Sequence, residues 1–161
     1  MKPIVLATDG SPSAAEATLQ AVELARALEA PLVAVSVEHS PLAGAGYYGS
    51  AEVMAELSKV AAERVEETLA QVLAVADEAG VVCEAVHAAG SVPEEICRTA
   101  ARRKARMIVI GAHGWGPLRR VLHGSVSTAV VHEARCPVLV VGAAPELVDE
   151  RPDVSRTLAL S

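Results

Sequence analysis

The chain has 161 residues, 52% of them hydrophobic, which predicts one domain with a buried core of its own. It has no phenylalanine, one tryptophan and two tyrosines, so the aromatic platforms that stack on single-stranded nucleic acid are missing. The net charge of −6 makes the chain a poor candidate for binding duplex DNA or RNA. We therefore expect no nucleic-acid partner.

The start of the chain predicts a strand, a helix and a second strand. Residues 3–8 form a short apolar run that an Asp-Gly pair ends. Ser11 is a typical N-cap and Pro12 fits the first helical position, so a helix is expected to follow. Residues 32–37 form a second apolar run, which predicts the second strand.

The middle of the chain predicts a long loop and a long helix. Residues 39–50 are rich in Pro, Gly, Ala and Tyr, and a loop of this length often covers a ligand. Apolar residues recur at helical spacing over 51–79, and Gly80 supplies a C-terminal stop. The stripe consists of Met54, Leu57, Ala61, Val65, Leu69, Val72 and Ala76.

The second half of the chain continues the alternation and carries most of the basic residues. Residues 98–135 hold eight basic side chains and one acidic one, whereas residues 1–97 hold 15 acidic and four basic ones. We interpret the basic triplet at 102–104 as the end of a helix, where cations complement the dipole. The predicted elements are strands at 81–88, 107–110 and 137–141 and helices at 93–103 and 125–134.

Strands that alternate with helices predict a parallel sheet with right-handed crossovers. The apolar runs lack polar alternation, so helices should cover both faces of the sheet. We predict an α/β fold, an open doubly wound five-stranded parallel sheet of Rossmann-like type with strand order 3-2-1-4-5. Residues 1–142 form the predicted domain, and 143–161 form a C-terminal tail that is flexible or contacts a partner.

The three cysteines, Cys83, Cys97 and Cys136, have neither CxxC spacing nor the spacing of a metal site. We interpret them as small buried hydrophobic residues that stay reduced in a cytosol. No apolar run reaches the length of a signal peptide or a membrane span. These features predict a cytoplasmic protein without a membrane partner.

In an open parallel sheet, ligands bind outside the carboxyl ends of the strands. Asp9 follows the first strand, where its carboxylate could accept hydrogen bonds from a ribose or from an adenine amino group. The same carboxylate could instead form an Asx-type turn that starts the helix. Both interpretations of Asp9 stay open at this point.

A glycine motif, G-x2-G-x9-G-S, follows the fourth strand and leads into the last helix. Glycines let backbone amides approach an anion, and a serine at a helix N-terminus adds a hydroxyl to free N–H groups, a combination suited to phosphate. Arg119 or Arg120 could add positive charge. The fixed positions of the motif are Gly111, Gly114, Gly124 and Ser125.

This motif resembles the nucleotide-binding signature of the universal stress protein family. It is followed by Val126-Ser127 and by RCPVLVV at 135–141, which is similar to that family's usual ending. The opening IVLATDGS at 4–11 is similar to its usual beginning. The resemblance spans residues 1 to about 142 and favours the family's ATP-binding branch.

The resemblance implies an ATP site at the carboxyl ends of the first and fourth strands, without a metal site of its own; any Mg²⁺ would come with the nucleotide. The residues implied for adenosine are Ala7, Asp9 and Val37, and those for ribose and phosphates are Gly111, Gly114, Gly124, Ser125, Val126 and Ser127. The family also pairs its last strand with that of a partner. The implied homodimer seam is Pro137, Val138, Leu139, Val140 and Val141.

Three functions are consistent with the sequence. The first is a nucleotide-responsive homodimeric module in stress signalling, and the second is a slow ATPase or phosphotransferase. The sequence offers no recognisable catalytic base or nucleophile for the second: His113 and His123 lack a partner carboxylate, and Ser125 lacks an evident triad. The third is a nucleotide-free scaffold, against which the complete glycine motif argues.

Overall fold

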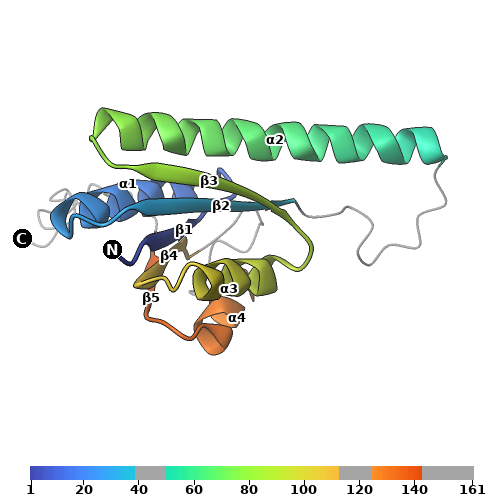
Figure 1. Cartoon of the computed structure of the whole chain (residues 1–161). Helices are drawn as coiled ribbons and strands as arrows, with labels where there is room; N and C mark the ends of the chain where they lie inside the picture. Colours follow the sequence, from blue (N-terminus) through green and yellow to red (C-terminus); the bar gives the residue numbers. More distant parts are fainter. Residues whose placement is uncertain (39–49, 113–124, 143–161) are drawn as a thin grey trace, which may run out of the picture.

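The structure is a computed structural model that describes residues 1–38, 50–112 and 125–142. Within these ranges, strands and helices alternate along the chain (Figure 1). The strands are β1 (Ile4–Ala7), β2 (Leu32–Glu38), β3 (Cys83–Ala89), β4 (Met107–Gly111) and β5 (Val138–Val141). The helices are α1 (Pro12–Ala27), α2 (Ala51–Glu78), α3 (Val92–Arg102) and α4 (Ser125–Glu133).

The strands form one sheet in the order β3-β2-β1-β4-β5, and every neighbouring pair is parallel. The predicted fold class and strand order are thereby confirmed. Because all strands run the same way, their starts share one edge of the sheet, here called the amino edge, and their ends share the opposite carboxyl edge. The predicted tail at 143–161 and nearly all of the predicted loop at 39–50 lie outside the described residues.

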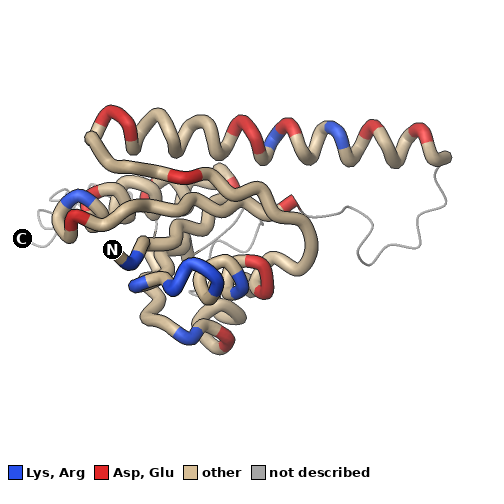
Figure 2. The backbone as a smooth tube through the Cα atoms, viewed as in Figure 1, with Lys and Arg blue, Asp and Glu red and all other residues tan. Residues whose placement is uncertain are grey.

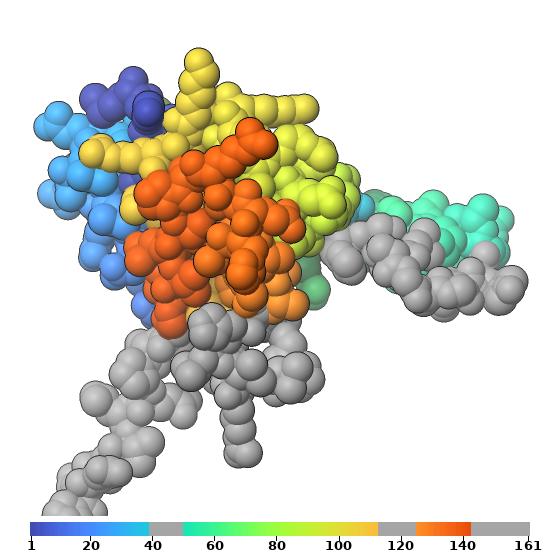
Figure 3. Space-filling view, turned by 90° about the horizontal axis from the view of Figure 1, so that it is seen from below, coloured from blue at the N-terminus to red at the C-terminus, as the bar shows by residue number. Residues whose placement is uncertain are grey.

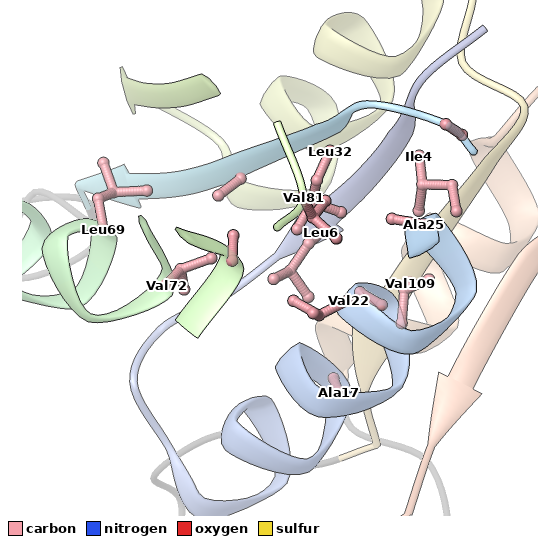
Figure 4. Close-up of a cluster of buried hydrophobic side chains, with 14 of the residues drawn as sticks. Ile4, Leu6, Ala17, Val22, Ala25, Leu32, Leu69, Val72, Val81 and Val109 are labelled. Atoms are coloured by element: carbon pink, nitrogen blue, oxygen red, sulfur yellow. The ribbon is translucent and has the colours of Figure 1, made fainter. Parts of the chain in front are cut away.

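Helices cover both faces of the sheet. Alternate side chains of β1 show this division, since Leu6 packs with α1 and α2 whereas Val5 packs with α3 and α4. Figure 4 shows the first of these two cores, where Leu6 lies near Val22 of α1 and Val72 comes from α2. Aliphatic side chains fill both cores, so the strands are buried in the way that their unbroken apolar runs predict.

The amino-terminal half of α2 extends beyond the sheet (Figure 1). Its apolar stripe is buried from Val65 onward, whereas Met54 and Ala61 are partly exposed and Leu57 is 40% exposed. The helical spacing therefore predicted the helix correctly, but burial of its apolar residues begins only at Val65. The helix is longer than the strands beneath it, and periodicity does not reveal where the sheet ends. In the described part of the chain, no helix is long and apolar enough to cross a bilayer.

The three cysteines are half-buried, a correction to the prediction that they are buried. Cys83 lies on the edge strand β3, and Cys136 lies in the turn before the edge strand β5. Desolvation is the main cause that raises the pKa of each of the three thiols. A raised thiol pKa keeps the sulfur protonated near neutral pH and lowers its nucleophilicity, in line with a packing role.

Three helices end with a residue in the left-handed region. Gly80 takes this position after α2, but Glu29 and Lys104 take it after α1 and α3, with φ of 51° and 50°. A side chain in this conformation costs about 1–2 kcal/mol, because its Cβ lies close to the following carbonyl oxygen. We expect Glu29→Gly to raise the free energy of unfolding by about 0.5–1 kcal/mol, after the added freedom of glycine in the unfolded chain is subtracted. Urea denaturation measures the change.

Gly80→Ala is the matched control, since it places a Cβ on a glycine with φ of 70° in otherwise open space. This variant should lose about 1 kcal/mol of stability. A Glu29→Gly variant no more stable than the parent would contradict the strain assigned to this position.

Candidate functional site

A pocket of about 230 Å³ lies at the carboxyl edge of the sheet. Residues from β1, β2, β4, the first turns of α1 and α4, and α3 surround it. Its polar lining residues are Thr8, Asp9, Ser11 and Ser127. The others are Ala7, Ala14, Val35, Val37, Val92, Ile96, Ile110, Gly111, Ala112 and Val126. The pocket thus has aliphatic walls with a few polar groups, the usual composition of a small-molecule site.

The turn between β1 and α1 supplies most of these polar groups. Asp9 Oδ1 accepts a hydrogen bond from the backbone N–H of Ser11 at 2.9 Å, which is the Asx-type turn that the sequence left as an alternative. Ser11 caps α1 through its Oγ, which accepts from the N–H of Ala14 at 3.3 Å. A carboxylate offers about four acceptor positions, so the turn and contact with a ligand are compatible roles for Asp9.

The first turn of α4 is held against the end of β4. The hydroxyl of Ser127 donates a hydrogen bond to the carbonyl oxygen of Ala112 at 3.4 Å, and Ser127 is buried. The N-terminus of α4 therefore lies beside the pocket, with the positive end of its helix dipole and the backbone N–H groups that have no partner within the helix itself. This arrangement suits the negative charge of a phosphate or carboxylate.

The structure brings together most of the predicted site residues that it describes. Those that line the pocket are Ala7, Asp9, Val37, Gly111, Val126 and Ser127. Ser125 begins α4 and is exposed, outside the pocket lining. The other predicted residues, Gly114, Gly124, Arg119 and Arg120, lie outside the described residues.

One wall of the pocket was not predicted from the sequence. Val92 and Ile96 lie one turn apart on α3, and both line the pocket. Only the ends of the first and fourth strands carried a motif, whereas α3 shows the ordinary apolar spacing of a packed helix. The right-handed crossover rule could have indicated this wall, because it places α3 on the same face of the sheet as α4, next to the ends of β1 and β2.

Gly111 has a packing role that the motif alone does not show. A Cβ at this position would lie 2.6 Å from Ser13 Oγ and 2.8 Å from the carbonyl carbon and oxygen of Ser13. The glycine therefore lets the first turn of α1 approach β4 closely. In the described ranges, no group of three or more His, Cys, Asp or Glu side chains is placed to hold a metal ion.

Comparisons with known proteins give one consistent result. The sequence model of the universal stress protein family matches residues 1–142. A universal stress protein from Methanocaldococcus jannaschii is 39% identical over 141 residues, which cover 87% of this chain and 81% of the relative. The solved universal stress protein UspA from Lactobacillus plantarum has a TM-score of 0.76 at 25% identity, covering 87% of this chain and 97% of that one. A universal stress protein from Archaeoglobus fulgidus, solved in complex with dAMP, has a TM-score of 0.59 at 25% identity, covering 88% and 98%.

The resemblance inferred from the glycine motif and the two ends of the sequence is confirmed by these matches. The five-stranded parallel sheet agrees with the solved relatives over most of the chain. The chain therefore belongs to the universal stress protein family.

Proposed function

We propose that this protein binds ATP in the pocket at the carboxyl edge and acts as a nucleotide-responsive homodimer in cytoplasmic stress signalling. The observation that carries the proposal is the pocket itself, in which aliphatic walls meet a carboxylate turn and a helix N-terminus. The aliphatic walls suit a base, the carboxylate of the turn suits a ribose and the helix N-terminus suits a phosphate. The relative from Archaeoglobus fulgidus, solved in complex with dAMP, supports an adenine nucleotide as the ligand.

The size of the pocket suggests that it holds only part of the ATP molecule. Its volume of about 230 Å³ is below the roughly 300–1,000 Å³ of pockets that take up drug-sized ligands. We assign the adenosine part of ATP to this cavity, between Val37 and the α3 wall, with the ribose toward Asp9. The phosphates then extend to the first turn of α4, and the motif assigns Gly114, Gly124 and Ser125 to them, with Arg119 and Arg120 as added charge.

Isothermal titration of the nucleotide-free protein tests this proposal. ATP, adenosine and inorganic tripolyphosphate are titrated separately, each with and without Mg²⁺. We expect one ATP per chain, bound more tightly than either part, because the base and the phosphates use different groups of the site. The absence of saturable ATP binding, or equal affinity for tripolyphosphate, would overturn the proposed function.

The homodimer is assigned to β5, which is an edge strand of the sheet. The carbonyl oxygen of Pro137 accepts a hydrogen bond from Ile108 of β4 at 2.9 Å, and that of Val141 accepts one from Ala112, directly after β4, at 2.7 Å. Successive residues of a strand point their backbone groups to opposite sides, so those of Val138 and Val140 point to the open edge. An apolar strand with such an edge is suited to pairing with a second copy of itself.

Val140→Pro tests this seam, because proline removes one N–H at the open edge and leaves the bonds to β4 in place. We expect the variant to weaken the dimer at least about tenfold, as measured by native mass spectrometry over a dilution series. Val140→Ala keeps the N–H and is the control, which should dimerise like the parent. Undiminished dimerisation of Val140→Pro would place the seam elsewhere.

A further inference from the structure

The charges of the molecule are segregated in space. Figure 2 shows acidic residues along α2 and basic residues gathered around the end of α3 and the starts of β1, β4 and β5. Figure 3 shows that the yellow segment at the end of α3 and the orange segment of α4 and β5 share one face. The basic group lies at the amino edge, at the opposite end of the strands from the pocket. We call it the basic patch, formed by Lys2, Arg102, Lys104, Arg106 and Arg135.

Backbone contacts bring these residues to one place. The N–H of Arg106 donates to the carbonyl oxygen of Pro3 at 2.8 Å, which joins the segment before β4 to the segment before β1. The N–H of Ile108 donates to the carbonyl oxygen of Pro137 at 2.9 Å, which joins the start of β4 to the turn after Arg135. Residues about one hundred positions apart in the sequence therefore share one surface.

Within the described ranges, no ion pair neutralises the patch. The arginines nearby that do have partners lie beside it: Arg103 pairs with Glu84 and Arg98 with Glu95. All five patch side chains are exposed, and none of them forms an ion pair with a described residue. The other acidic residues at this edge are Glu29 before β2, Glu133 at the end of α4, and Asp77 and Glu78 before β3, the strand at the far side of the sheet from β4 and β5. The surface therefore carries a local positive field on a chain whose net charge is −6.

Part of this charge has a local explanation, and part does not. Arg102 lies in the last turn of α3, where a cation complements the helix dipole. Lys2 and Arg106 belong to no helix and gain nothing from such a dipole. Exposed like charges repel one another, so five cations on one surface lower stability unless an anion offsets them.

We propose that the basic patch binds an acidic segment of a partner protein. Arginine guanidinium groups take carboxylates in a bidentate way, and three of the five cations are arginines. A nucleic acid fits less well, because the described ranges contain no Phe, Tyr or Trp side chain on which a base could stack. A long polyanion would also be repelled by the acidic face of α2, whereas a short acidic segment need contact only the patch.

Fluorescence anisotropy with a labelled peptide of eight glutamates tests the proposal on the full chain, against a labelled oligothymidylate of equal charge. The patch variant carries Arg106→Glu and Arg135→Glu. The matched control carries Lys59→Glu and Arg64→Glu in the amino-terminal half of α2, so both variants change the net charge equally. We expect the patch variant to weaken peptide binding at least about tenfold and the control to change it less than about threefold.

Three results would overturn the proposal: peptide affinity unchanged in the patch variant, an equal loss in the control, or tighter binding of the oligothymidylate than of the peptide by the parent protein. The milder pair Arg106→Gln and Arg135→Gln replaces the charge-reversal variant if charge reversal prevents folding, and it should weaken peptide binding about threefold or more. Raising the salt from about 50 to 200 mM should weaken the parent's binding and change that of the patch variant little.

Discussion

Replacing Gly111 by alanine should lower the free energy of unfolding by about 3 kcal/mol, the upper part of the range for overpacked sites. The added methyl group would meet the carbonyl carbon and oxygen of Ser13 at 2.8 Å, and backbone atoms cannot turn aside as the end of a flexible side chain can. Relief requires α1 to move away from β4, which disturbs the turn that begins the helix. Urea denaturation of the purified variant measures the loss.

Gly142→Ala is the control for this prediction. Gly142 follows β5, and a Cβ there meets nothing within 4 Å, so the change should stay within about 0.5 kcal/mol. Equal stability of the two variants would show that α1 can move away from β4 without lowering the free energy of unfolding, and would contradict the prediction. A Gly111→Ala variant with full stability but weakened ATP binding would assign this glycine to the ligand alone.

Val92→Trp should weaken ATP binding at least about a hundredfold, equivalent to about 2.7 kcal/mol. Val92 is the first residue of α3 and lines the pocket, and an indole in its place would occupy much of a cavity of about 230 Å³. Because Val92 is partly exposed, the larger side chain should cost the fold little. Isothermal titration gives the affinity, and thermal unfolding reports on the fold.

Val82→Trp makes the same substitution at a residue that is 79% exposed, in the turn between α2 and β3. It should bind ATP within about twofold of the parent, since it lies away from the pocket lining. ATP binding undisturbed by Val92→Trp would mean that the nucleotide lies elsewhere, even if the family assignment holds.

Much of the fold could be predicted because its signals are local. Ser11 and Pro12 specify the start of α1 within two neighbouring positions, and the structure has the serine as N-cap. The unbroken apolar runs of β1 and β4 indicate strands covered on both faces, and both strands are buried. The predicted ends of strands and helices differ from the observed ones by a residue or two at most positions, since helix and strand ends fray.

The burial of some residues could not be predicted from the sequence, for a shared physical reason. The exposure of Leu57 and the half-buried state of Cys83 depend on where the sheet ends above or beside them. Neither periodicity nor residue type carries that information, because the end of the sheet is set by strands far away in the sequence. The same holds for Ile96 as a pocket wall, since its spacing is that of any helix packed on a sheet.

By itself, the sequence determined the alternation of strands and helices, the helix caps and the family, because each of these is encoded in short stretches of residues or in motifs of fixed spacing. Only the tertiary structure decided that α3 closes the pocket, that Gly111 lies against Ser13, and that the basic residues form one surface at the amino edge. Those arrangements join segments distant in the chain, and packing of both sheet faces brings them together.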